Sequence, residues 1–256
     1  MRYGQDSGYG FDPMSRMRGA TVVKVLLLTN VALYILELVA QATGYYGLMI
    51  GLLGMVPKLI TDNHFFWQFL TACFLHAGFF HILFNMLALF FFGPELEWLW
   101  GKVRFLFVYL AIGILANVFA YLLNIHATTP TLGASGALFG LLGAYAAIYP
   151  NRMIIFMIFP VKVKYFVLFY FIFSLLATTG LEIGGGQGVA YAVHLAGIVL
   201  GFLYVKMRWG RLSLFFKNNA SRIRLWYLKR KYRHLKIADE ILVDDEQHDR
   251  WNRYKQ

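Results

Sequence analysis

The stretch TLGASGALFGLLGAY, residues 131–145, sets one serine, Ser135, between glycines at the start of an apolar run. Gly136, Gly140 and Ala144 recur at intervals of four, which on a helix makes a ridge of small residues that lets a second helix approach closely. The first N–H groups of a helix are free, and the positive end of its dipole favours an alkoxide or an oxyanion. Ser135 is therefore either a capping or packing serine or a nucleophile at a helix end.

The composition around this stretch is that of a membrane protein. Of 256 residues, 59% are hydrophobic and 14% charged, whereas soluble domains are about 25% charged. Apolar runs of about 20 residues cross the ~30 Å hydrocarbon layer, and they must be helical because lipid offers no partner to free backbone groups. We expect an all-α membrane protein, a six-transmembrane-helix bundle over residues 20–208 with tails at 1–19 and 209–256. Its helices are expected near residues 20–42, 77–97, 103–124, 133–150, 163–181 and 188–207.

Lysine and arginine lie mostly on one side of these predicted spans. They occur in the N-terminal tail, after the second and fourth runs, and behind the sixth, while the opposite side carries Lys58 alone. By the positive-inside rule both termini are cytoplasmic. We expect an integral multi-pass protein of a bacterial inner membrane.

The net charge of +11 comes largely from the C-terminal tail. In residues 211–236, Leu, Phe, Ile, Trp and Tyr alternate with Lys and Arg, which suits a helix lying on anionic lipids. A solvated basic tail that only enforces topology fits equally well. No nucleic-acid-binding fold is recognisable, so we expect no nucleic-acid partner. The single cysteine, Cys73, excludes an intrachain disulfide and a cysteine-based metal site.

The segment 43–76 between the first two predicted spans is too long for a simple connection. Its mixture of aliphatic and aromatic residues predicts short amphipathic pieces in the outer interface. The segment is either a structural cover over the bundle or a lateral lip that guards a site.

Polar residues inside apolar helices are costly and mark candidate sites. His81 and Asn85 are four residues apart and share one helix face, as two donors for an oxyanion or as an interhelical hydrogen-bonded pair. A metal site would need further ligands that this helix does not supply. His194 shares a face with Gly197 and Gly201, so a close approach of that face to the ridge at residues 136–144 would bring His194 within reach of Ser135.

Together these motifs resemble the rhomboid family of intramembrane serine proteases, over residues 20–207. The chain is similar to the family pattern in five segments that occur in the family order: WQFLTACFLH (67–76), HAGFFHILFN (76–85), GPELEWLWG with Gly93, Glu97 and Gly101, GASG around Ser135, and HLAGIVLG from His194. One departure is Gln68, where the family commonly has arginine. That change bears on the rigidity of the loop rather than on the chemistry.

The resemblance implies a Ser–His dyad without a carboxylate. Ser135 would be the nucleophile and His194 the general base and acid, while His81, Asn85 and the Ser135 N–H would hold the oxyanion. Phe139 occupies a family position often filled by an aromatic that stacks on the histidine, and Glu97 would cap or tether the loop that follows it. Other residues are expected to support the site: His76, Gly133, Gly136, Gly197 and Gly201. The mechanism asks for no cofactor or metal.

The expected function is endoproteolysis of single-span membrane-protein substrates close to the outer face of the membrane. Residues 178–188 and 43–76 are expected to form the rim of the water-filled site. A rhomboid-like pseudoprotease that binds membrane clients is the main alternative, although such members lose the serine or the histidine. A small-molecule transporter would want midplane charges and repeated halves, and the sequence shows no internal repeat.

Overall fold

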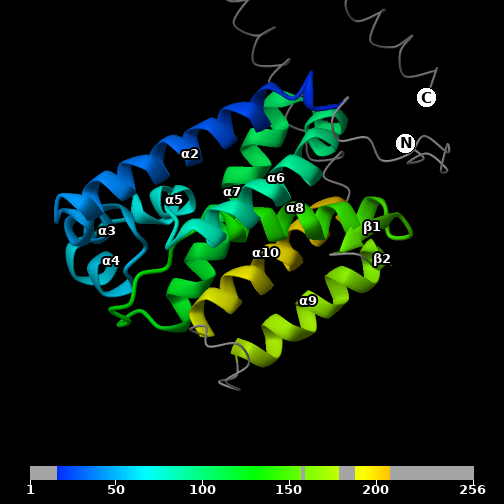
Figure 1. Cartoon of the computed structure of the whole chain (residues 1–256). Coiled ribbons are helices and arrows are strands. Elements are labelled where there is room, and N and C mark those ends of the chain that lie inside the picture. The colour runs from blue at the N-terminus through cyan, green and yellow to red at the C-terminus, as the bar shows by residue number, and fades with distance from the viewer. Residues whose placement is uncertain (1–15, 157–158, 179–187, 208–256) are drawn as a thin grey trace, which may run out of the picture. The chain divides into compact units, whose positions relative to one another are not determined.

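The computed structural model describes residues 16–156, 159–178 and 188–207, and these residues are mostly helical (Figure 1). The chain divides into two compact units, residues 1–207 and 208–256. The expected basic tail, most of the N-terminal tail and the glycine-rich part of the expected rim lie outside the described residues.

Helices occur at all six predicted apolar runs, with ends within three residues of those expected. Three of them, α2 (Thr21–Ala42), α6 (Phe79–Trp100) and α7 (Lys102–Leu123), are 22 residues long and apolar enough to cross a membrane. The other three are shorter, with 14, 16 and 19 residues. Their bounds are α8 (Ser135–Ile148), α9 (Val163–Thr178) and α10 (Gly188–Lys206).

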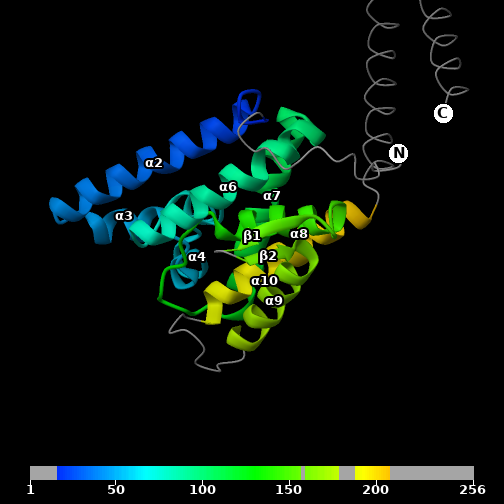
Figure 2. The same ribbon diagram turned by 45° about the vertical axis from the view of Figure 1, so that its right-hand side comes forward.

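Helix α8 is the centre of the bundle, with α6, α7, α9 and α10 packed around it (Figures 1 and 2). Eleven of its 14 residues are buried, from Ser135 to Ala146. A helix that is apolar all round and built from Gly, Ala and Leu can accept neighbours on every side. The stretch that carries Ser135 therefore forms the core that the other helices cover.

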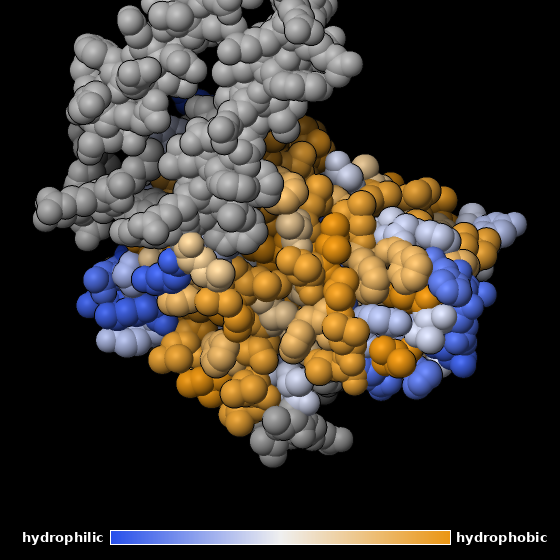
Figure 3. Space-filling model, turned by 180° about the vertical axis from the view of Figure 1, so that it is seen from behind, coloured by the Kyte–Doolittle hydropathy of each residue, from blue (hydrophilic) through white to orange (hydrophobic). Residues whose placement is uncertain are grey.

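The outer surface of the bundle is apolar in the way that a lipid-facing surface is. Large side chains such as Leu28, Val103, Phe107 and Leu122 are 66–85% exposed. Figure 3 shows a broad hydrophobic surface between hydrophilic ends. Soluble monomers rarely expose apolar patches of this extent, so the surface fits an integral membrane protein.

The segment between α2 and α6 folds into short helices: α3 (Tyr46–Leu53), α4 (Pro57–Asn63), α5 (Gln68–Thr71) and the 3₁₀ turn η1 (Ala72–Phe74). Backbone hydrogen bonds tie it to the loop before α8. Met55 and Thr131 exchange N–H···O bonds of 3.2 and 2.8 Å, and the Gly133 N–H donates to the Ala72 carbonyl at 2.9 Å. The segment therefore holds the loop that leads into Ser135.

A short antiparallel hairpin, which the sequence does not predict, links α8 to α9. Its strands are β1 (Met153–Phe156) and β2 (Phe159–Lys162), paired Met153 to Lys162 and Phe156 to Phe159. Beside it the buried Glu95 carboxylate accepts hydrogen bonds from Arg152 and from the Tyr145 hydroxyl, the latter at 2.7 Å. This charge-assisted cluster fixes the end of α8 opposite to Ser135.

Candidate active site

Ser135 is the first residue of α8 and lies beside His194 of α10. The Ser135 Oγ and His194 Nε2 are 2.9 Å apart, within hydrogen-bond distance. The N-cap residue of α8 is Ala134, and no side chain makes a capping hydrogen bond at this end, so the interpretation of Ser135 as a capping serine is wrong. The side chain of this buried serine faces a histidine instead.

The close approach of α8 and α10 depends on glycines of both helices. A Cβ added to Gly197 would lie 2.2 Å from the Gly136 carbonyl oxygen, and one added to Gly201 would overlap the Gly140 carbonyl oxygen. The Val193 side chain occupies the space beside Gly136, where an added Cβ would lie 2.6 Å from it. The two small-residue faces meet as expected, and at these positions side chains larger than hydrogen do not fit.

The His194 ring is held by aromatic contacts. Phe139 stacks on it with ring centroids 4.4 Å apart and an interplanar angle of 29°, and Tyr191 meets it edge-on at 6.1 Å. Among the described residues, no carboxylate hydrogen-bonds to this ring. An aromatic stack fixes the orientation of the imidazole, the task that the third member of a catalytic triad performs elsewhere.

His81 and Asn85 of α6 face the loop that leads to Ser135. A Cβ added to Gly133 would lie 2.7 Å from His81 Nε2 and 3.6 Å from Asn85 Nδ2, and Gly133 has a φ of +123°, which L side chains rarely adopt. His81 Nδ1 accepts the Ala77 N–H at 3.4 Å, so Nε2 carries the proton of the neutral ring. Both donors therefore lie against the backbone two residues before Ser135.

The Asn85 amide nitrogen has an unmet hydrogen-bonding capacity. Asn85 is 8% exposed, and its Nδ2 has no partner within the described residues. Buried polar groups are normally paired, and the exceptions call for an explanation. The interpretation of His81 and Asn85 as an interhelical pair predicts partners on both, so the free Nδ2 favours the oxyanion interpretation.

His76 lies just before α6, with its ring edge-on to His81 at a centroid distance of 5.1 Å. Burial, with a smaller contribution from His81, lowers the pKa of His76 to about 4, so its ring is neutral at physiological pH. Its backbone N–H donates to both oxygens of the Glu37 carboxylate at 3.0 and 3.2 Å. This contact from α2 fixes the start of α6, and its only sign in the sequence is an acid within an apolar helix.

Gln68 stabilises the segment before α6. It is fully buried, its amide donates to the Gly51 carbonyl at 2.8 Å, and its Oε1 accepts the Val56 N–H at 3.0 Å. A neutral amide at this position satisfies one donor and one acceptor of the loop. With glutamine in place of the family's arginine, this position still ties two parts of the segment together through its side chain.

Glu97 also acts elsewhere than expected. Its carboxylate accepts the N–H groups of Val22 and Val23 at 3.0 and 2.9 Å, so it caps the N-terminus of α2 rather than the loop that follows α6. A carboxylate at that end of a helix satisfies free donors and complements the dipole. Gly93 lets α2 approach, because an added Cβ would lie 2.8 Å from Val23.

The arrangement suits nucleophilic chemistry. A serine hydroxyl, a neutral imidazole within hydrogen-bond distance and unpaired N–H donors nearby are the parts that acyl transfer requires. Within the described residues, no group of three or more His, Cys, Asp or Glu side chains is placed to hold a metal ion. The fold and site together define a candidate serine hydrolase built into a bundle of apolar helices.

Comparison with known proteins identifies the family. The model of the rhomboid domain matches residues 63–211, more than half of the chain, and the chain therefore belongs to the rhomboid family. YdcA of Bacillus subtilis is 42% identical over 98 residues, which cover 36% of this chain and 47% of YdcA.

Other relatives differ in what their names say of activity. Rhomboid protease GluP of Bacillus subtilis is 42% identical over 89 residues, covering 34% of this chain and 17% of GluP. Inactive RHOMBOID-like protein 8 of Arabidopsis thaliana is 38% identical over 93 residues, covering 36% of this chain and 25% of the relative. The chain thus spans less than half the length of these curated relatives.

Proposed function

We propose that this chain is an intramembrane serine endopeptidase that uses Ser135 and His194 as a catalytic dyad. Its proposed substrates are single-span membrane proteins, cleaved in or near their transmembrane segments. The observation that carries the proposal is the 2.9 Å contact between Ser135 Oγ and His194 Nε2. A relative named as a rhomboid protease, GluP, supports proteolysis as the activity.

In the proposed reaction Ser135 Oγ attacks the scissile carbonyl carbon while its proton passes to His194 Nε2. The carbonyl oxygen becomes an oxyanion, which accepts hydrogen bonds from Asn85 Nδ2, His81 Nε2 and the N–H of Ser135. Collapse breaks the C–N bond, and the proton on His194 goes to the leaving amine. Water then attacks the acyl-enzyme with His194 as base, and Ser135 regains its proton. No step needs a cofactor or a metal.

The proposed topology has six transmembrane helices over residues 20–208 and both termini in the cytoplasm of a bacterial cell. Since α8 then starts on the outer side, Ser135 lies near the outer face, as do His81 early in α6 and His194 early in α10. The segment from α3 to η1 forms part of the rim. The basic tail from residue 209 is proposed to lie on anionic lipids of the inner leaflet.

The decisive test is cleavage of a transmembrane reporter by the purified protein in liposomes. Wild type should release product, and Ser135→Ala and His194→Ala should each abolish it. A fluorophosphonate probe should label Ser135 in the wild type and not in His194→Ala. Equal product from Ser135→Ala would end the proposal.

A pseudoprotease that binds membrane clients is the alternative, since one relative is named as inactive. It predicts that wild type neither cleaves the reporter nor reacts with the probe. The short Ser135–His194 contact argues against it.

A further inference from the structure

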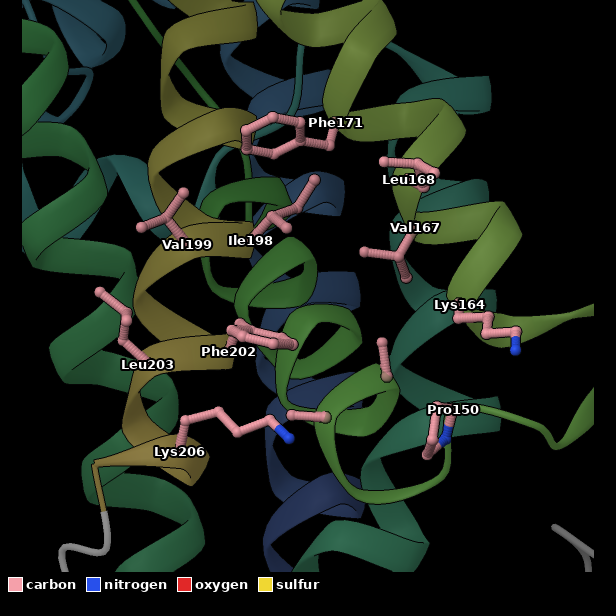
Figure 4. Close-up of a pocket in the computed structure, with 12 residues that line it drawn as sticks. Pro150, Lys164, Val167, Leu168, Phe171, Ile198, Val199, Phe202, Leu203 and Lys206 are labelled. Carbon is pink, nitrogen blue, oxygen red and sulfur yellow. The ribbon is translucent and has the colours of Figure 1, made fainter.

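An open groove lies between α8, α9 and α10, at the end of α8 away from Ser135 (Figure 4). Its volume is about 480 Å³, within the range of small-molecule sites. The walls come from α9 and α10, and Ala146 of α8 contributes to the floor. The main apolar wall residues are Val167, Leu168, Phe171, Val199, Phe202 and Leu203. Because Leu168, Phe202 and Leu203 are 41–52% exposed, the groove opens onto the apolar outer surface.

Two lysines stand at one end of this groove. Lys164 is in the first turn of α9 and Lys206 is the last residue of α10. In Figure 4 the Lys206 side chain extends from α10 toward α8, whereas the Lys164 side chain leaves α9 at the same end and points away from α10. Their long stems let both ammonium groups reach the same headgroup layer.

Neither charge is neutralised by the described part of the protein. The Lys164 and Lys206 ammonium groups lie 5.0 and 5.5 Å from the rings of Tyr165 and Phe202, and neither forms an ion pair with a described carboxylate. No acidic residue lines the groove. Arg152, at the same end of α8, differs because it pairs with Glu95.

We propose that this groove is a binding site for one anionic glycerophospholipid, with its phosphate between Lys164 and Lys206 and an acyl chain along α9 and α10. From Lys164 to Phe171 the apolar path runs seven residues, about 10 Å along the helix. An exposed apolar groove in an integral membrane protein meets lipid chains, and two lysines at its polar end complement a phosphate. The lipid comes from the leaflet opposite to Ser135.

The charge, rather than the groove, supplies the selectivity for anionic lipid. A lipid chain leaves one apolar environment for another when it enters the groove, so the chain adds shape but little driving force. Each lysine near an anionic headgroup favours binding about fivefold, so both together favour an anionic over a zwitterionic lipid by about 30-fold. A lipid seated there contacts α10, the helix that carries His194.

The test uses the purified full chain in detergent with equal amounts of phosphatidylglycerol and phosphatidylcholine, and native mass spectrometry counts the lipid that stays bound. Wild type should retain phosphatidylglycerol about 30-fold over phosphatidylcholine. The Lys164→Gln/Lys206→Gln variant should bring the two within about twofold. The matched control is Lys24→Gln/Lys102→Gln, which removes the same charge from α2 and α7 outside the groove and should keep the preference.

A further variant separates the groove from its charges. Leu168→Trp fills the groove from a half-exposed position and leaves both lysines in place, so it should lose the retained lipid while the protein stays folded. Folding is checked by the protection of the buried Cys73 thiol. Retention unchanged in Leu168→Trp, preference unchanged in Lys164→Gln/Lys206→Gln, or an equal loss in the control would each overturn the proposal.

Discussion

Replacing Gly197 by alanine should separate the proposed catalytic pair, Ser135 and His194, without changing either residue. The added Cβ would lie 2.2 Å from the Gly136 carbonyl oxygen, whereas ordinary contacts begin at 3.4 Å. The difference, 3.4 − 2.2 = 1.2 Å, is the distance by which α10 must move away from α8 at this level. Gly136 adjoins Ser135, and Gly197 lies one turn beyond His194. The helices therefore open at the level of the dyad itself.

A movement of this size breaks the hydrogen bond of the dyad. The Ser135–His194 distance of 2.9 Å would rise toward 4.1 Å, beyond the range of a hydrogen bond. Misplacement of reacting groups by about 1 Å can cost about 10²-fold in rate. We expect Gly197→Ala to cleave a transmembrane reporter at about 1% of the wild-type rate or less, and to destabilise the bundle by about 1–3 kcal/mol through overpacking.

Gly143→Ala is the matched control. Its Cβ would lie 2.3 Å from the Ile198 carbonyl oxygen in the same interface, so the overpacking is similar, but Gly143 is eight residues, about 12 Å, beyond Ser135. It should lose comparable stability and far less activity per folded molecule. If both variants lose activity equally, or if Gly197→Ala keeps the wild-type rate, the close approach of the two helices does not set the dyad.

Three other substitutions or treatments test separate contacts. Asn85→Ala should lower kcat by about 10²–10³-fold with little change in KM, as reporter kinetics would show, because it removes a preorganised donor. Glu97→Ala should lower the free energy of unfolding by about 1–3 kcal/mol, since the N–H groups of Val22 and Val23 lose their acceptor, and thermal unfolding measures it. Burial raises the pKa of the Cys73 thiol to about 12, so at pH 8 a maleimide should label the folded protein more than about 10²-fold slower than a free thiol. Labelling should become faster as the pH rises toward 12 or as the protein unfolds. Fast labelling of the folded protein at pH 8 would contradict the burial of this thiol.

The sequence predicts the helices well because a long apolar run is a local signal that can be recognised without knowing its neighbours. Each apolar run became a helix within three residues of its predicted ends, and the glycines of α8 and α10 identified the faces that meet. The placement of Ser135 beside His194 followed from those faces together with the order of the family motifs. Their catalytic roles are a proposal that geometry supports.

Contacts between distant polar residues were not predictable in the same way. The Glu97 carboxylate accepts a hydrogen bond from the Val22 N–H, and the Gln68 side chain hydrogen-bonds to the backbone of its own segment. The residues next to Glu97 and Gln68 in the sequence do not indicate these partners. The β1–β2 hairpin was missed because its two four-residue strands lie between two strong helical signals. A hydrogen bond across 75 positions leaves no periodic trace, whereas a helix face repeats every three or four residues.

The shortness of α8 has a consequence for where hydrolysis can occur. Fourteen residues make a rod of about 21 Å, some 9 Å less than a hydrocarbon layer of about 30 Å. In the proposed six-helix topology, the chain beyond the ends of α8 completes the crossing as irregular chain, which is tolerated only where other parts of the protein cover it. Met55 and Ala72 cover this chain, because their backbone carbonyls accept hydrogen bonds from the N–H groups of Thr131 and Gly133. In the proposed topology, a central helix of this length places the Ser135 hydroxyl below the membrane surface rather than at it.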